Sequence, residues 1–97
     1  MKSITVTEVP VNVQLIDVRE PDEFAEVHAC GAKNVPLSQL PDLTGEINDD
    51  QEIYVICRSG GRSAQAAQYL ERYFDRDDIV NVEGGTIAWV EAELPTE

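Results

Sequence analysis

Three short, largely apolar runs dominate the hydrophobic pattern of the chain. They occupy residues 14–18, 52–57 and 79–82, and their apolar positions do not follow a helical period. Such runs are typical of strands that are covered on both faces of a parallel sheet. We therefore expect these three segments to be buried strands.

Helical patterns alternate with these strands. Residues 20–27 place a proline early and acidic residues in the first turn, which favours a helix N-terminus. Residues 62–74 carry apolar side chains at near-helical spacing and predict the longest helix. A last amphipathic helix is expected after the glycines at 84–85, with four apolar side chains: Ile87, Trp89, Val90 and Leu94. Pro95 ends it.

Weaker signals fill the rest of the chain. Residues 4–6 and 32–36 suggest short strands, 37–43 one or two broken helical turns, and 45–51 a polar surface loop. Strands that alternate with helices imply βαβ units with right-handed crossovers. The sequence thus predicts an α/β fold, with a central parallel sheet of about five strands and helices on both faces. At 97 residues it also predicts a single domain, 1–97.

One loop carries the candidate chemistry. Cys57 ends the second apolar run, and six residues follow it: Arg58, Ser59, Gly60, Gly61, Arg62 and Ser63. The two glycines permit positive φ, so successive backbone N–H groups can turn toward the sulfur and form an anion-binding cradle. The next helix N-terminus and the two arginines favour the thiolate. We therefore interpret Cys57 as a nucleophile and residues 58–63 as its binding loop. The alternative is a buried structural cysteine at a tight strand-to-helix turn.

Composition narrows the possible partners. The chain is 42% hydrophobic and 27% charged with a formal net charge of −12, which predicts a folded globule with an acidic surface. Seven basic residues cannot form the basic face that nucleic acid or an anionic membrane requires. No apolar stretch resembles a secretory leader or a membrane span, so we expect a cytoplasmic protein with reduced thiols. The two cysteines lack metal-type spacing, and no metal is expected.

Two further segments are expected at the same edge of the sheet as Cys57. Asp17 and Arg19 end the first buried strand, and Gly84 and Gly85 follow the third. Because ligand sites of open α/β sheets lie beyond the carboxyl ends of the strands, we expect these residues to line or support one site. The cradle suits either a tetrahedral oxyanion, as in a phosphatase or arsenate reductase, or a persulfide.

Four short signatures occur in order along the chain. They are residues 15–20 with Glu23 and Phe24; His28, Gly31, Ala32, Asn34 and Pro36; residues 57–63; and residues 82–85 with Trp89 and Pro95. Together they resemble single-domain rhodanese-like sulfurtransferases of the thiosulfate sulfurtransferase type. The resemblance implies that Cys57 takes a sulfane sulfur from a donor such as thiosulfate, holds it as a persulfide and passes it to a thiol or to cyanide. It implies no metal and no organic cofactor.

Loop length separates this interpretation from its rivals. Four residues lie between Cys57 and Arg62, whereas the related phosphatases and arsenate reductases resemble a pattern with five. The shorter ring of amides is narrower, so it suits a sulfur atom better than a phosphate. A second alternative is a non-catalytic rhodanese-like module that binds or regulates a partner.

The resemblance also suggests structural roles around the site. We expect Asp17 and Arg19 to hydrogen-bond each other and adjacent loops, and His28 to be a structural histidine rather than a general base. Two positions depart from the family pattern: Cys30 stands where proline is commoner, and Glu93 stands where glycine usually precedes the final Leu-Pro. We interpret Cys30 as a buried cysteine without a partner, with a resolving thiol as the alternative. Glu93 predicts a different end to the last helix.

The overall charge bears on the sulfur donor. A protein that carries a net charge of −12 repels an anionic donor such as thiosulfate at long range. We therefore hypothesise that the physiological donor or acceptor is a protein with a basic patch, or an uncharged persulfide source.

Overall fold

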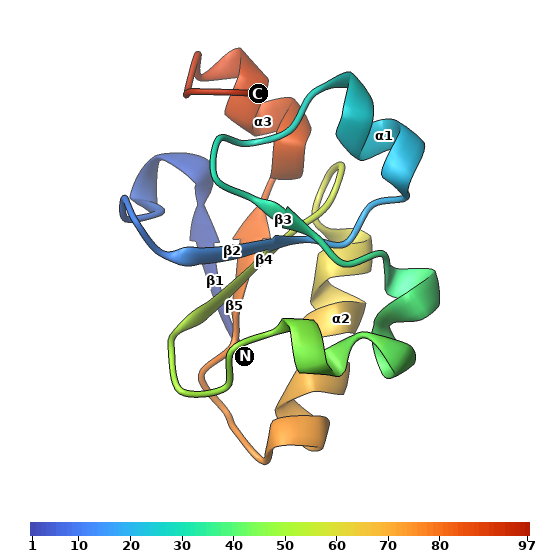
Figure 1. Cartoon of the computed structure of the whole chain (residues 1–97). Coiled ribbons are helices and arrows are strands. Elements are labelled where there is room, and N and C mark those ends of the chain that lie inside the picture. The colour runs from blue at the N-terminus through green and yellow to red at the C-terminus, as the bar shows by residue number, and fades with distance from the viewer.

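One sheet of five parallel strands, in the order β1-β5-β4-β2-β3, forms the centre of the computed structural model, which describes all of residues 1–97 (Figure 1). The strands are β1 Lys2–Thr5, β2 Gln14–Asp17, β3 Lys33–Asn34, β4 Ile53–Ile56 and β5 Val80–Glu83. The three apolar runs of the sequence form β2, β4 and β5, which are the inner strands. The predicted α/β fold with a central parallel sheet is thus confirmed.

Three α-helices and three 3₁₀ segments accompany the strands, and all but α3, which follows the last strand, lie between two strands. They are η1 Val6–Glu8, α1 Pro21–Glu26, η2 Leu37–Asp42, η3 Thr44–Glu46, α2 Gly61–Phe74 and α3 Gly85–Glu91. α1 begins where the sequence predicts, because Pro21 is its first residue and the Glu23 carboxylate accepts the Glu20 backbone N–H at 3.0 Å. None of the helices combines the length and the apolar character needed to cross a membrane.

The sheet separates two apolar clusters. On one face, Ile16 and Val55 pack in a cluster with Leu70 of α2, which we call the α2-side cluster. On the other face, Ile56 packs in a cluster with Trp89 of α3, the α3-side cluster. Successive side chains of a strand point to opposite faces, so β2 and β4 each contribute to both clusters. Helices therefore cover both faces, as predicted.

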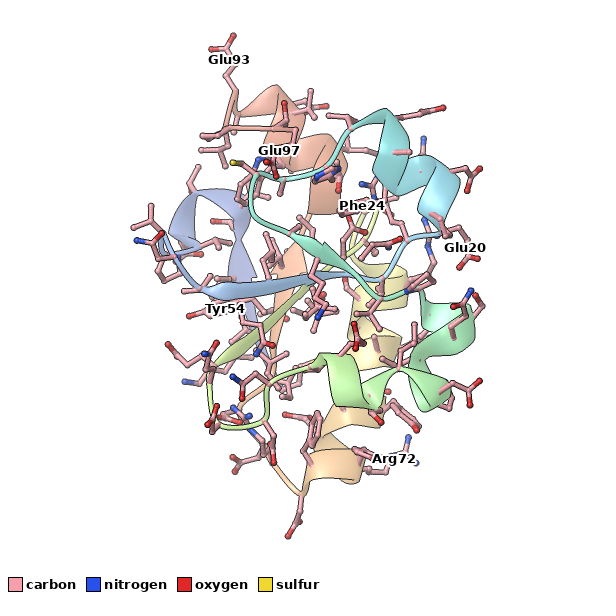
Figure 2. All side chains as sticks on the ribbon, in the orientation of Figure 1. Glu20, Phe24, Tyr54, Arg72, Glu93 and Glu97 are labelled. Carbon is pink, nitrogen blue, oxygen red and sulfur yellow. The ribbon has the colours of Figure 1, made fainter.

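The last helix is shorter than its apolar pattern predicts. α3 ends at Glu91, and Glu93 turns the chain with a φ of +58°, in the left-handed region that favours glycine. Leu94 lies outside the helix and packs against the α3-side cluster, so the prediction that α3 holds it is wrong. The side chain of Glu93 points away from the body of the protein (Figure 2).

The segment expected to be a polar surface loop, residues 45–51, contributes to the core. The 3₁₀ segment η3 overlaps it, and Ile47 is only 5% exposed in the α2-side cluster. The Gln14 side chain fixes Asn48, the residue after Ile47. It donates to the Asn48 carbonyl at 2.9 Å and accepts the Asn48 N–H at 2.7 Å. One apolar residue in a polar run produces no periodicity, which is why the pattern missed this contact.

Candidate active site

The Cys57 loop joins β4 to α2 at the carboxyl edge of the sheet. The sulfur of Cys57 accepts hydrogen bonds from the Gly60 backbone N–H at 3.1 Å and from the Ser63 hydroxyl at 3.3 Å. Gly60 takes a φ of +117° as the N-cap of α2, a conformation that costs glycine little. Gly61 has no positive φ and is the first residue of α2, so only one of the two glycines has the expected conformation.

The surroundings of Cys57 favour the thiolate. Cys57 is only 1% exposed, and burial by itself raises the pKa of its thiol. Hydrogen bonds from the Ser63 hydroxyl and from the backbone N–H groups of Ser63, Gly60 and Ser59 outweigh burial and lower this pKa below its usual value. A buried sulfur that faces several donors is suited to act as a nucleophile.

Asn81 is a member of the site that the sequence analysis missed. It lies on β5, is 6% exposed, and its side-chain oxygen accepts a hydrogen bond from the Ser63 hydroxyl. Its amide nitrogen faces the Gly60 carbonyl at 3.4 Å, and the Ser63 hydroxyl lies 3.1 Å from the same carbonyl. One available signal was that Asn81 is polar within an otherwise apolar run, because a buried amide needs hydrogen-bond partners.

The first turn of α3 holds the loop from the other side. The Thr86 backbone N–H donates to the Cys57 carbonyl at 2.8 Å, and the Ile87 N–H donates to the Arg58 carbonyl at 3.2 Å. Gly85 permits this approach, since a Cβ at its position would lie 2.5 Å from the Arg58 carbonyl, and its φ is +59°. Gly84 precedes it as the N-cap of α3, with a φ of +81°.

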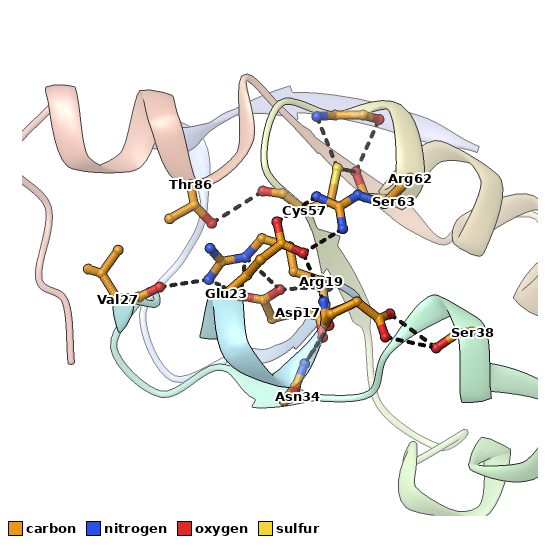
Figure 3. Close-up of polar contacts among 12 residues, drawn as sticks. Asp17, Arg19, Glu23, Val27, Asn34, Ser38, Cys57, Arg62, Ser63 and Thr86 are labelled. Atoms are coloured by element: carbon orange, nitrogen blue, oxygen red, sulfur yellow. Dashed lines mark hydrogen bonds and ion pairs between the residues drawn. The ribbon is translucent and has the colours of Figure 1, made fainter. Parts of the chain in front are cut away.

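The two arginines of the loop have different surroundings. Arg62 forms a bidentate ion pair with Glu23 of α1, with N–O distances of 2.7 and 2.9 Å (Figure 3). This pair lowers the pKa of Glu23 to about 2. The guanidinium of Arg58 is exposed and has no hydrogen-bond or ion-pair partner. The positive charge of Arg62 is therefore balanced within the protein, whereas that of Arg58 is free to meet an anion.

Asp17 and Arg19 form a buried pair beneath the site (Figure 3). They are 0% and 5% exposed, and the Arg19 guanidinium donates to both carboxylate oxygens of Asp17 at 2.8–3.1 Å. Arg19 also donates to the Val27 carbonyl at 2.7 Å, and the Asn34 amide donates to the Asp17 and Arg19 carbonyls at 3.0 and 2.9 Å. These bonds tie the ends of β2, α1 and β3 together.

Neither His28 nor Cys30 forms a hydrogen bond with the sulfur of Cys57. The His28 ring stacks on Phe24 with centroids 3.6 Å apart, and its Nδ1 lies 2.7 Å from the Phe24 carbonyl. Cys30 is exposed, so its interpretation as a buried cysteine is wrong. It borders a hollow beside Trp89, in the α3-side cluster, whereas Cys57 belongs to the α2-side cluster on the opposite face of the sheet.

Known proteins are similar to this chain in sequence and in architecture. A protein named sulfurtransferase from Allochromatium vinosum is 38% identical over 85 residues, which cover 87% of this chain and 78% of that protein. Thiosulfate sulfurtransferase GlpE from Shewanella oneidensis is 38% identical over 82 residues, 84% of this chain and 79% of that protein. The crystal structure of a rhodanese-related protein from Thermoplasma volcanium matches with a TM-score of 0.89 at 32% identity, over 100% of this chain and 98% of that one. The rhodanese-like domain family matches residues 8–92, and the chain therefore belongs to the rhodanese-like family.

Proposed function

We propose that this protein transfers a sulfane sulfur through a persulfide on Cys57. The family and its sulfurtransferase relatives support a sulfurtransferase in general terms. The observation that carries the finer proposal is the pair of donors on the sulfur: the Gly60 N–H at 3.1 Å and the Ser63 hydroxyl at 3.3 Å. Donors aimed at this sulfur stabilise its negative charge before it attacks the donor and again when it leaves as the thiolate in the second half-reaction.

The first half-reaction loads the sulfur. With thiosulfate as donor, the Cys57 thiolate attacks the outer sulfur, a new S–S bond forms, and the old S–S bond breaks with its electron pair leaving on sulfite. The product is a Cys57 persulfide whose charge lies on the terminal sulfur. The exposed guanidinium of Arg58 is the free cation near the loop, so we assign it to the incoming anion.

The second half-reaction regenerates the Cys57 thiolate. Cyanide or a thiolate attacks the terminal sulfur, the persulfide S–S bond breaks, and Cys57 leaves as the thiolate. The products are thiocyanate or a new persulfide, and no external oxidant or reductant is consumed. The donors that lower the pKa of Cys57 also make its thiolate the better leaving group in this step.

Intact-mass measurement tests the proposal. After incubation with thiosulfate, the parent protein should gain one sulfur atom, and cyanide should remove it with release of thiocyanate. Cys57→Ser should gain none. Cys30→Ser is the matched control, because it removes the exposed second thiol and should load sulfur like the parent. A parent that neither loads sulfur nor releases thiocyanate would contradict the proposal and favour a non-catalytic binding module.

A further inference from the structure

A groove lies beside the Cys57 loop, where α1 and α3 approach each other. Its volume is about 510 Å³, within the range of roughly 300–1,000 Å³ that is common for ligand sites. Its walls include Val27 after α1, Arg58 of the loop and Val90 of α3. Cys57 itself is not among the lining residues, so the groove is a neighbour of the sulfur cradle rather than the cradle itself.

Backbone contacts tie the groove to the reactive sulfur. Thr86 and Ile87 line it, and their N–H groups donate to the carbonyls of Cys57 and Arg58 at 2.8 and 3.2 Å. A molecule seated in the groove therefore lies against the residues that hold the loop. Neither thiosulfate nor cyanide is large enough to fill a space of this size.

The groove exposes apolar side chains that the core does not use. Ile87 is 40% exposed and Val90 is 46% exposed, although Trp89 between them is nearly buried on the opposite side of α3. The sequence pattern groups all three in one amphipathic helix, and the structure leaves two of them facing the groove together with Val27. Single exposed apolar residues are common, but three around one hollow offer a surface that an apolar side chain can cover.

The charges of the groove favour a cation. Two lining residues, Arg19 and Glu23, are each balanced by an ion-pair partner within the protein. Glu26 and Glu91 have no ion-pair partner. The guanidinium of Arg58 is the one positive charge among the lining residues that is also unpaired. These two carboxylates, on a chain with a net charge of −12, attract a basic ligand and repel an acidic one.

From these observations we infer that the groove binds a peptide segment of the acceptor protein, with an apolar residue beside the acceptor cysteine and a lysine or arginine close to it. The apolar side chain covers Ile87 and Val90, and the basic residue faces Glu26 and Glu91. This inference rests on the persulfide chemistry proposed above and names its acceptor. The peptide thiolate attacks the terminal sulfur of the Cys57 persulfide, the S–S bond breaks, and Cys57 leaves as the thiolate.

Binding and transfer are tested separately. For binding, two capped peptides that lack a thiol, Lys-Leu-Ser-Lys and Glu-Leu-Ser-Glu, are titrated into ¹⁵N-labelled protein. The basic peptide should bind at least about tenfold more tightly than the acidic one. Its largest chemical-shift changes should be at the amides of Ile87 and Val90. Equal affinities, or shifts located elsewhere, would overturn the inference.

Variants identify the contacts. Val90→Ser should weaken the basic peptide about fivefold, because it removes apolar cover worth about 1 kcal/mol. Val11→Ser is the matched control, since Val11 is 85% exposed and lies outside the groove. Glu26→Gln combined with Glu91→Gln should bring the two peptides close to equal affinity. An unchanged preference in this double variant would contradict the assigned charges.

Transfer uses the same peptides with cysteine in place of serine. Val90→Ser should slow transfer to Lys-Leu-Cys-Lys about fivefold and leave transfer to cyanide unchanged, because cyanide does not use the groove. A protein that binds the peptide but forms no persulfide would refute the proposed chemistry and leave the groove as a binding site. A protein that forms the persulfide but does not distinguish the two peptides would refute the groove and leave the chemistry intact.

Discussion

Replacing Ser63 by alanine should raise the pKa of Cys57 by about one unit. The Ser63 hydroxyl lies 3.3 Å from the sulfur and is among the donors that lower this pKa. A hydrogen bond to an ionised acceptor contributes about 1.5–3 kcal/mol. Because the one hydroxyl proton also has Asn81 and the Gly60 carbonyl as acceptors, we expect the lower end of this range, about 1.5 kcal/mol, which corresponds to about one pKa unit.

The assay is the rate of alkylation by iodoacetamide as a function of pH. It is performed in a Cys30→Ser background, so that Cys57 is the only thiol. The rate follows the thiolate fraction, rises with pH through the pKa and then reaches a plateau. In Ser63→Ala this rise should move to higher pH. Ser59→Ala is the control, because the Ser59 contribution comes from its backbone N–H, which alanine retains.

A second variant tests whether Asn81 affects the pKa of Cys57 through the Ser63 hydroxyl. In the structure, the side-chain oxygen of Asn81 competes with the sulfur for the Ser63 proton. Asn81→Ala should therefore lower the pKa of Cys57 when Ser63 is present and leave it unchanged when Ser63 is already alanine. An unaltered pKa in Ser63→Ala, or an equal rise in Ser59→Ala, would refute the reasoning.

Three further substitutions test the surroundings of the site. Glu23→Gln should reduce the free energy of unfolding by about 1 kcal/mol at neutral pH. Since the pKa of Glu23 is lowered from 4.5 to about 2, this stabilisation is complete above pH 4.5 and is lost as the pH falls through 2, so urea titrations of parent and variant should converge there. Gly85→Ala should reduce the free energy of unfolding by about 2–3 kcal/mol and slow sulfur transfer, because its Cβ meets the Arg58 carbonyl. Gly45→Ala is the control, since a Cβ there meets open space, and equal effects of the two substitutions would contradict this account. Glu93→Gly should gain about 0.5 kcal/mol in thermal unfolding, because the relieved left-handed strain of about 1–2 kcal/mol exceeds the added entropy of the unfolded chain; a loss of stability would contradict it.

The parts of the fold that the sequence predicts are those encoded by contiguous residues. Strands β2, β4 and β5 are buried on both faces, so each leaves an uninterrupted apolar run. The Cys57 loop is equally local, because its sulfur, its glycines and the start of α2 lie within seven consecutive residues. The family's glycine before the final Leu-Pro also made the altered end of α3 predictable, and the left-handed φ of Glu93 is the physical reason.

The parts that the sequence does not predict depend on pairs of residues far apart in the chain. Glu23 and Arg62 are 39 positions apart, so the sequence predicts only that the charge of Arg62 favours the thiolate. Its ion pair with Glu23 is visible only in the fold. Ser63 and Asn81 are 18 positions apart, and Asn81 was read only as part of a strand. A short apolar pattern also does not show which side chains pack against each residue. The sequence therefore does not reveal that Ile87 and Val90 are exposed.

The contact between α3 and the loop explains how a distant helix shapes the chemistry of Cys57. In a trans peptide group the C=O and N–H bonds point in opposite directions. The Ile87 N–H draws the Arg58 carbonyl toward α3, so the N–H of Ser59, which belongs to the same peptide group, points the other way. That N–H is among the donors that lower the pKa of Cys57. A change in the first turn of α3 that tilts this one peptide group therefore alters the reactivity of the sulfur without replacing any residue of the loop.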